Sequence, residues 1–342
     1  MMRKRAALKD IALRVGVSTA LVSYVLNNQE EEKRVGKEMA KKIRQAAIDL
    51  NYTTNQIAKS LKTRKTNTIG VIVADINYRY TSGVTKAIEA ECQKYNLTVI
   101  YGSSGENAEK FAQLITIFID RQVDGLILVP VENCNDQIEY LAKNEIPFVL
   151  IDRIMKDVHA TVISIDNTKT AYMETMHLIK NGYKRIAYVS YKTKLLNLLD
   201  RKKGYLNALA EAKIKTDVRL IREIDDTDIH DHVKLVIDEL LRLSPPCDAI
   251  LFSTDTLAVE GLREINALHV KVPERLGIVS FDESDAFELF YCPITHGRQP
   301  LAEIGRMAVL TLIDSMNHSK IRKSILLDTE FILGKSCGEK SG

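Results

Sequence analysis

Polar residues follow several apolar runs of the chain, at the point where each run ends. Carboxylate and guanidinium groups at such positions can form paired hydrogen bonds with neighbouring hydroxyl groups, as a sugar or nucleoside presents them. Each residue alone is equally well explained as a helix N-cap or a loop ion pair, so a ligand site is predicted only because they converge on one edge. The residues are Asp75, Arg79, Tyr80, Asp152, Arg153, Thr254, Asp255 and Asp282.

The apolar runs that precede these residues alternate with amphipathic helical segments, which predicts parallel sheets covered by helices on both faces. This pattern continues for about 265 residues, more than one typical sheet needs, so we expect two lobes. Ligands of such sheets bind beyond the carboxyl ends of the strands. The runs are "TIGVIVA", "LTVIY", "GLILVP", "PFVLID", "TVISID", "RIAYVS", "AILFST" and "GIVSF".

The first part of the chain has a different pattern. In "ALKDIALRVGVSTALVSYVLNN", residues 7–28, two short helical segments flank Gly16, and Ser18 is placed to cap the second one. Two helices joined by so short a turn predict a helix-turn-helix, whose second helix enters the major groove of DNA. A third helical segment from Met39 to Leu50 would complete a three-helix core. A helical bundle without a nucleic-acid partner is the alternative.

The distribution of charge favours the DNA-binding interpretation. Residues 1–66 carry 15 Lys or Arg and 6 Asp or Glu, a balance of +9, so the remaining residues carry 33 against 39, a balance of −6. A basic head on a mildly acidic body indicates a polyanion partner for the head. A solvated basic segment would show the same balance.

The composition is that of a folded chain outside the membrane. It is 45% hydrophobic and 27% charged, and no apolar run approaches the roughly 18 residues that cross a bilayer. The basic start "MMRKRAALKD" does not continue as a signal peptide, because Lys9 and Asp10 interrupt it. The five cysteines are scattered without a C-x-x-C pair, which suits reduced thiols. We expect a cytoplasmic protein with no metal and no cofactor.

The stretches "LKDIALRVGVSTALVSYVLNN" and "AIDLNYTTNQIAKSLKTRKTNTIGVIVADI" resemble the N-terminus of the LacI/GalR family of bacterial transcription regulators, and the similarity continues in order to about residue 330. The resemblance implies an α/β fold with an N-terminal three-helix helix-turn-helix domain and a two-lobed core of the type I periplasmic-binding-protein kind. It implies a DNA-binding domain at 1–53, a hinge at 54–66, a core N-subdomain at 67–165 with about 298–327, and a core C-subdomain at 166–297 with about 328–342.

The resemblance also assigns DNA contacts. Thr19, Ala20 and Tyr24 would face base edges, and other polar residues of the same helix would hold phosphates. Two hinge segments would pair on the operator, where Leu61 would wedge into the minor groove. A helix this short is marginal alone, so a flexible tether describes the unbound hinge. The residues assigned to DNA are Ser18, Thr19, Ala20, Ser23, Tyr24, Asn27, Tyr52, Asn55, Ala58 and Leu61.

For the ligand site, the resemblance adds Arg201 as the anchoring arginine, Asp282 as its counterpart in the second lobe, and Gln299 at a crossing between lobes. The chain has no Trp, so Tyr80 or Phe281 would supply a ring that stacks on a sugar.

Several positions depart from the family pattern. Tyr24 stands where Arg is usual, so base readout should differ, because Arg grips a guanine edge with two hydrogen bonds whereas Tyr offers one hydroxyl and a ring. Gly36 lies where Ser or Thr often caps the third helix, Thr54 where Pro is frequent, and Thr254 where Asn is frequent. Neither operator nor effector can therefore be copied from relatives.

Catalytic signatures such as G-x-S-x-G, a phosphate-binding loop or H-E-x-x-H do not occur in the sequence. We read "GSSG" at 102–105 as a turn and "HDH" at 230–232 as a surface feature.

The favoured function is a DNA-binding transcriptional regulator, expected to be a repressor, that binds a near-palindromic operator as a homodimer. A small-molecule effector of carbohydrate type would control it from between the lobes. A stand-alone sugar receptor and a sugar- or nucleoside-processing enzyme on the same core are the alternatives.

Overall fold

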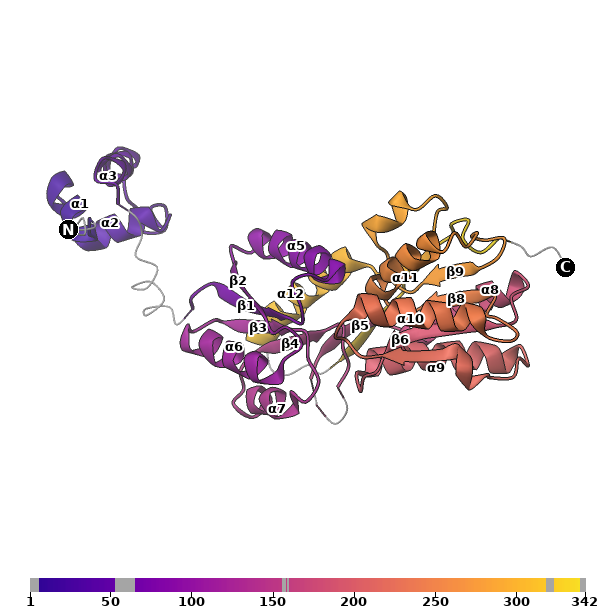
Figure 1. Cartoon of the computed structure of the whole chain (residues 1–342). Helices are drawn as coiled ribbons and strands as arrows, with labels where there is room; N and C mark the ends of the chain where they lie inside the picture. The colour runs from indigo at the N-terminus through magenta and orange to yellow at the C-terminus, as the bar shows by residue number, and fades with distance from the viewer. Residues whose placement is uncertain (1–5, 53–64, 156–157, 159, 318–322, 339–342) are drawn as a thin grey trace. The chain divides into compact units, whose positions relative to one another are not determined.

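A computed structural model describes residues 6–52, 65–155, 158, 160–317 and 323–338 (Figure 1). The chain divides into two compact units, Met1–Thr66 and Asn67–Gly342, and each is described by itself.

The first unit contains three helices, α1 (Leu8–Val15), α2 (Thr19–Leu26) and α3 (Lys37–Asp49). Gly16 ends α1 with a left-handed backbone at φ 76°, and the Ser18 side chain caps α2 by accepting from Leu21 N at 3.2 Å. Both local predictions are thereby confirmed, as is the third helix, which begins after Gly36 without a side-chain cap. The three helices enclose a small core made of Ile11, Ala12, Val22, Val25, Ala40, Ile43, Ala46 and Ala47.

The second unit contains two six-stranded sheets, which define two lobes. The first sheet has the order β11-β5-β4-β3-β1-β2 and is parallel throughout. Its strands are β1 (Thr68–Val73), β2 (Thr98–Ser103), β3 (Gly125–Leu128), β4 (Phe148–Ile151), β5 (Val162–Ile165) and β11 (Ser324–Leu327).

The second sheet has the order β12-β10-β9-β8-β6-β7, and only the β10–β12 pair is antiparallel. Its strands are β6 (Ile186–Tyr191), β7 (Ile221–Ile224), β8 (Ala249–Phe252), β9 (Gly277–Ser280), β10 (Thr295–Arg298) and β12 (Glu330–Ile332). Two doubly covered parallel sheets confirm the predicted fold class. The eight apolar runs all form strands, whereas β7, β10, β11 and β12 were not predicted, because they are short and, except for β11, contain charged residues.

Helices cover both faces of each sheet. In the first lobe α5 lies beside α12, and α6 and α7 lie across the sheet from them (Figure 1). In the second lobe α8 and α9 pack with Leu251 and its neighbours on one face, and α10 and α11 pack with Ile250 and its neighbours on the other. The helices are α5 (Arg79–Lys94), α6 (Ala108–Asp120), α7 (Asn135–Lys143), α8 (Asn167–Lys180), α9 (Leu196–Glu211), α10 (Ile229–Arg242), α11 (Asp255–Ala267) and α12 (Leu301–Asn317), with short 3-10 turns at Val218–Leu220 and Asp285–Leu289.

The chain passes between the lobes after β5, after β10 and after β11, because consecutive elements there belong to different sheets. The last crossing is tied to the start of α8: Lys169 Nζ lies 2.6 Å from Asp328 Oδ1, and the hydroxyls of Thr170 and Thr329 are 2.8 Å apart. These crossings keep the carboxyl ends of both sheets facing one another, where the candidate ligand residues lie.

Candidate functional site

The exposed side of α2 carries the residues assigned to base reading. Val22 and Val25 are fully buried in the three-helix core, so Thr19 and Ala20 face outward and Tyr24 is half-buried. The face opposite the core is thus free to enter a groove. This arrangement is the one in which a helix-turn-helix presents its second helix to DNA.

The polar residues of α2 also make local contacts. Ser18 serves as the N-cap, and Asn27 Nδ2 donates to the Ser23 carbonyl at 2.8 Å and to Ser23 Oγ at 3.3 Å. Tyr52 packs against the edge of the three-helix core. Their roles as phosphate contacts remain predictions, and Asn55, Ala58 and Leu61 lie outside the described residues.

Some cations of the basic head are engaged within the protein. Arg44 of α3 forms an ion pair with Glu30 and donates to Asn28 Oδ1 at 3.2 Å. Lys37, Lys41 and Lys42 of the same helix are exposed. The positive surface of α3 is therefore provided by lysines.

In the second unit, Arg201 of α9 is the centre of a buried polar network. Its side chain is 3% exposed. Nε donates to Asn167 Oδ1 at 2.9 Å, and Nη1 donates to the Ser253 carbonyl at 2.5 Å and to Asp282 Oδ2 at 2.8 Å. The guanidinium carbon lies 3.7 Å from the centroid of the Phe281 ring, within the range of a cation–π contact.

Close packing of α8 on α9 permits this network. A Cβ added at Gly204 would lie 2.2 Å from the Thr168 carbonyl oxygen, so only glycine allows this approach. The approach places Asn167 at the start of α8 beside Arg201, one turn before Gly204.

Phe281 does not serve as the predicted stacking ring. It is 1% exposed, and Arg201 covers its face. A ring directly after a buried strand packs into the core beneath the site, which leaves Tyr80 as the candidate for a sugar contact.

Asp282 joins Arg201 to a crossing between the lobes. Its second oxygen, Oδ1, accepts from Gln299 Nε2 at 2.6 Å, so both carboxylate oxygens are bound by protein donors. The three residues that the family resemblance placed together therefore form one continuous hydrogen-bonded group.

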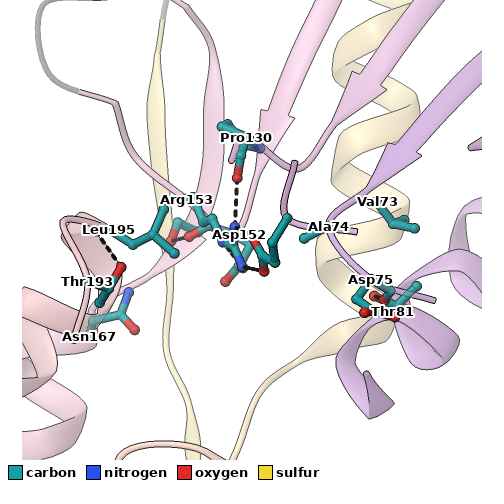
Figure 2. A network of polar contacts seen from close by, with 12 residues as sticks. Val73, Ala74, Asp75, Thr81, Pro130, Asp152, Arg153, Asn167, Thr193 and Leu195 are labelled. Carbon is teal, nitrogen blue, oxygen red and sulfur yellow. Dashed lines mark hydrogen bonds and ion pairs between the residues drawn. The ribbon is translucent and has the colours of Figure 1, made fainter. Parts of the chain in front are cut away.

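Asp152 and Arg153 stand at the carboxyl end of β4 (Figure 2). The terminal nitrogens of Arg153 bind first-lobe acceptors, both Glu106 oxygens at 2.8 and 2.6 Å and the Pro130 carbonyl at 2.9 Å, whereas its buried Nε has no hydrogen-bond partner among the described residues. Asp152 has a left-handed backbone at φ 69°, a strained conformation that is common at binding sites, and its side chain is 12% exposed. Burial raises the pKa of Asp152, although the charges of Arg153 and Arg201 oppose that shift.

Tyr80 and Asp255 lie near the residues described above. We call the whole set the interlobe polar cluster; its members are Tyr80, Asp152, Arg201, Asp255, Asp282 and Gln299. The Tyr80 hydroxyl is buried without a hydrogen-bond partner among the described residues, and burial, followed by the charge of Asp152, raises its pKa well above the ordinary value. Burial, followed by the charge of Asp282, raises the pKa of Asp255 to about 6. Residues from both lobes thus converge at the facing sheet edges.

Arg79 joins the lobes by ion pairs. From the start of α5 it reaches Glu283 at 2.9 Å and Asp285 at 2.9 Å, both of which follow β9 in the other lobe. Glu132, after β3, makes a second interlobe contact: it accepts from the backbone of Lys194 at 2.7 Å and from the Thr193 hydroxyl. We call these two groups the interlobe contacts. They join the strand ends of one lobe to those of the other.

Asp75 and Thr254 perform local roles. Asp75 Oδ1 accepts from the backbone and side chain of Asn77 at 2.8 and 2.9 Å, and Figure 2 shows it beside Thr81, apart from Asp152. Thr254 is the N-cap of α11, accepting from Leu257 N. Their assignments to an effector remain predictions.

Several residues of the site were missed by sequence reasoning. Asn167 follows the run "TVISI" and could have been found by the strand-end rule. Asn197 lies four residues before Arg201 on the same helix face, and its buried Oδ1 has no partner among the described residues. No sequence pattern pointed to Glu106, because it pairs with Arg153 across loops that are 47 residues apart in the chain.

Glu174 of α8 lies behind the cluster. It is fully buried, and neither carboxylate oxygen has a hydrogen-bond partner in the described part of the chain. Gly297 of β10 makes room for it, since a Cβ there would lie 2.7 Å from Oε1. Burial, followed by the charge of Asp282, raises the pKa of Glu174 well above the ordinary value, which favours the neutral form of the carboxyl group.

Within the described ranges, no group of three or more His, Cys, Asp or Glu side chains is arranged to hold a metal ion. His230 of "HDH" pairs with Glu260 at 2.8 Å on the surface of α10. All five cysteines, each of them described, are buried free thiols. No helix of the described chain is long and apolar enough to span a bilayer.

A helix-turn-helix unit together with a two-lobed sensor core defines the class of ligand-responsive, DNA-binding transcriptional regulators. Comparison with known proteins agrees. Residues 7–55 match the model of bacterial regulatory proteins of the lacI family, and residues 175–337 match that of the periplasmic binding protein-like domain.

Similar proteins cover almost the whole chain. The ribose operon repressor of Haemophilus influenzae is 31% identical over 335 residues, 97% of this chain and 98% of that protein. A solved LacI family regulator from Enterococcus faecium with bound ribose is 25% identical, covers 80% of this chain and 100% of that chain, and has a TM-score of 0.71. The lac repressor dimer bound to operator, 20% identical with a TM-score of 0.87, covers 98% of this chain and 100% of that one, and has the same fold. The chain belongs to the LacI family and is a DNA-binding transcriptional regulator.

Proposed function

We propose that the protein is a repressor that binds a near-palindromic operator as a homodimer, and that its effector is an uncharged, hydroxyl-rich molecule bound at the interlobe polar cluster. It acts by binding, without catalysis. The effector shifts the lobe arrangement by its differential affinity for the two states. The effector contacts proposed are Tyr80, Asp152, Arg201, Asp255, Asp282 and Gln299, with Asn197 added.

The observation that carries the proposal is the balance of donors and acceptors in the cluster. Arg153 donates through its terminal nitrogens, and Arg201 through Nε and Nη1, to protein acceptors. Asp152 meets only Arg153 Nε, at 3.4 Å, among the described side chains, and Asn197 Oδ1 has no partner there. Such a site favours a ligand that brings donors. A phosphate or carboxylate would face the carboxyl groups of Asp152 and Asp255, which disfavour a further negative charge.

A pentose is the first candidate, because a relative is named a ribose operon repressor and a solved family member holds ribose. A stand-alone receptor would not use the DNA-reading helix, and an enzyme would turn its ligand over.

Calorimetric titration of the full chain with D-ribose and with ribose 5-phosphate tests the ligand class. We expect ribose to bind and the phosphate to bind at least about tenfold more weakly, the difference made by one unpaired charge. Tighter binding of the phosphate would overturn the proposal.

Asp255 gives a second readout. The pKa of Asp255 is about 6, so the affinity for ribose should weaken as the pH falls through that value. Asp255→Asn should flatten this dependence of affinity on pH.

Selection from random duplexes tests the DNA-binding side. A near-palindromic consensus with two half-sites is expected, since a two-fold dimer places its reading helices about one helical turn apart or a multiple of it. A single, asymmetric site would contradict the proposed dimeric binding.

A further inference from the structure

The loop from Gln29 to Gly36 places three consecutive glutamates, Glu30 to Glu32, next to the DNA-reading helix. Unpaired carboxylates there would repel the phosphate backbone. The structure supplies partners for two of them: Glu30 pairs with Arg44, and Glu32 Oε1 lies 2.7 Å from Lys33 Nζ. The unpaired negative charge of the loop is therefore smaller than its three glutamates indicate.

Backbone hydrogen bonds fold this loop back onto the end of α2. Gln29 N donates to the Tyr24 carbonyl at 2.9 Å, Lys33 N to Gln29 O at 2.9 Å, and Val35 N to Glu30 O at 2.7 Å. Consecutive turns of this kind fix the position of Lys33 relative to α2, because each bond spans four or five residues.

The consequence is a contact between Lys33 and the reading surface. The Lys33 ammonium lies 5.9 Å from the centroid of the Tyr24 ring, at the outer range of a cation–π contact. Tyr24 lies one helical turn after Ala20, on the side of α2 away from the buried Val22 and Val25. Lys33 thus adjoins the face that meets bases, although it comes from outside the helix-turn-helix itself.

We propose that Lys33 is a specificity-determining residue that acts by positioning Tyr24. A tyrosine offers a base pair one hydroxyl and a ring, and its reading depends on ring orientation. An ammonium over one ring face fixes that orientation and leaves the ring edge and hydroxyl toward the groove. Glu32 forms an ion pair with the same ammonium. This inference rests on the proposed binding of operator DNA.

The experiment compares the base preferences of full-chain variants selected on random duplexes. Lys33→Met keeps the apolar stem but removes the charge, and Lys41→Met is the matched control, an exposed lysine of α3. We expect Lys33→Met to lower the preference at one base pair in each half-site by about two- to fivefold, the strength of an exposed cation–π contact. The rest of the consensus should be kept, and Lys41→Met should leave every preference unchanged.

A double variant separates positioning from a plain phosphate contact. In a Tyr24→Leu background, Lys33→Met should cause no further change in base preference, because the ring it positions is gone. If Lys33→Met weakens binding to all duplexes equally, or changes preference equally in both backgrounds, the inference is wrong. A wild-type chain without any sequence preference would instead overturn the proposed function.

Discussion

At the scale of single residues, Arg201 combines a structural role with the proposed role in ligand binding. It is buried, and it satisfies Asn167, the Ser253 carbonyl and Asp282 at once. Removing one partner of a buried pair leaves an uncompensated charge, which costs more than the pair contributes.

Arg201→Ala is therefore expected to lower the free energy of unfolding of the core by about 3–5 kcal/mol and to abolish effector binding. The adjacent Lys202, whose ion pair with Glu223 is partly exposed, provides the control. Lys202→Ala should change the free energy of unfolding by about 1 kcal/mol or less and leave effector binding intact. Urea unfolding monitored by circular dichroism measures both; a loss equal to that of Lys202→Ala would show that Arg201 is not a central contact.

Glu174 is a second residue whose environment sets its chemistry. Its folded-state pKa is raised above the ordinary value of 4.5, so the folded chain retains a proton that the unfolded chain releases. The unfolding free energy therefore decreases as pH rises from about 4.5 toward the folded-state pKa.

Glu174→Gln preserves the shape and removes the titration. We expect the variant to be more stable than the wild type at pH 7, and the difference to shrink as the pH approaches 4.5. Unfolding free energies measured in urea between pH 4.5 and 8 provide the check. Glu139→Gln, a change at an exposed position of α7, should show no such trend. Equal stabilities of wild type and Glu174→Gln at all pH values would mean that Glu174 has a partner in solution.

At the scale of elements, the interlobe contacts connect the two lobes, and we expect them to affect how tightly the lobes hold an effector. Arg79 extends from the first turn of α5 to residues after β9, and Glu132 extends from the loop after β3 to the segment before α9. Each contact joins strand ends of opposite lobes. An effector bound between those strand ends would stabilise the same lobe arrangement as these contacts do.

Arg79→Gln should weaken effector binding by about two- to fivefold, as expected for a partly exposed ion pair. Arg306→Gln is the control. Arg306 pairs with Glu303 inside α12, so the substitution removes the same charge without removing a contact between the lobes. Calorimetric titration of both variants measures the difference. Equal affinities for Arg79→Gln and Arg306→Gln would exclude a contribution of this contact to closure.

At the scale of the whole molecule, regulation requires that the two units influence one another. If an effector changes operator affinity by some factor, the operator must change effector affinity by the same factor. We expect calorimetric effector affinities with and without the selected duplex to differ by that reciprocal factor. Equal affinities in both conditions would leave no coupling through which the effector could act.

The hinge provides the second test at this scale. Leu61 lies outside the described residues, and its predicted role is the minor-groove wedge. Leu61→Ala should lower operator affinity by about tenfold or more, because the kinked duplex loses its wedge. Effector affinity without DNA should stay unchanged. Fluorescence anisotropy with a labelled operator measures the first and calorimetry the second; unchanged operator affinity would contradict the wedge.

The sequence by itself determined most of the elements and their order. Gly16, Ser18 and the spacing of Ile11, Val22 and Val25 act within a few residues, so the helix-turn-helix could be read directly. The apolar runs likewise gave eight strands, and their ends located most of the interlobe polar cluster, because parallel strands bring their carboxyl ends to one edge.

Only the tertiary structure decided which side chains contact one another. Arg79 meets Glu283 across 204 residues, Phe281 lies beneath Arg201, and Glu174 is buried against Gly297. Such pairings depend on how lobes and helices pack, and no local pattern encodes the distance between residues so far apart in the chain. The same reason explains the unpredicted strands such as β10, which lies in the sheet because neighbouring strands pair with it and not because its residues are apolar.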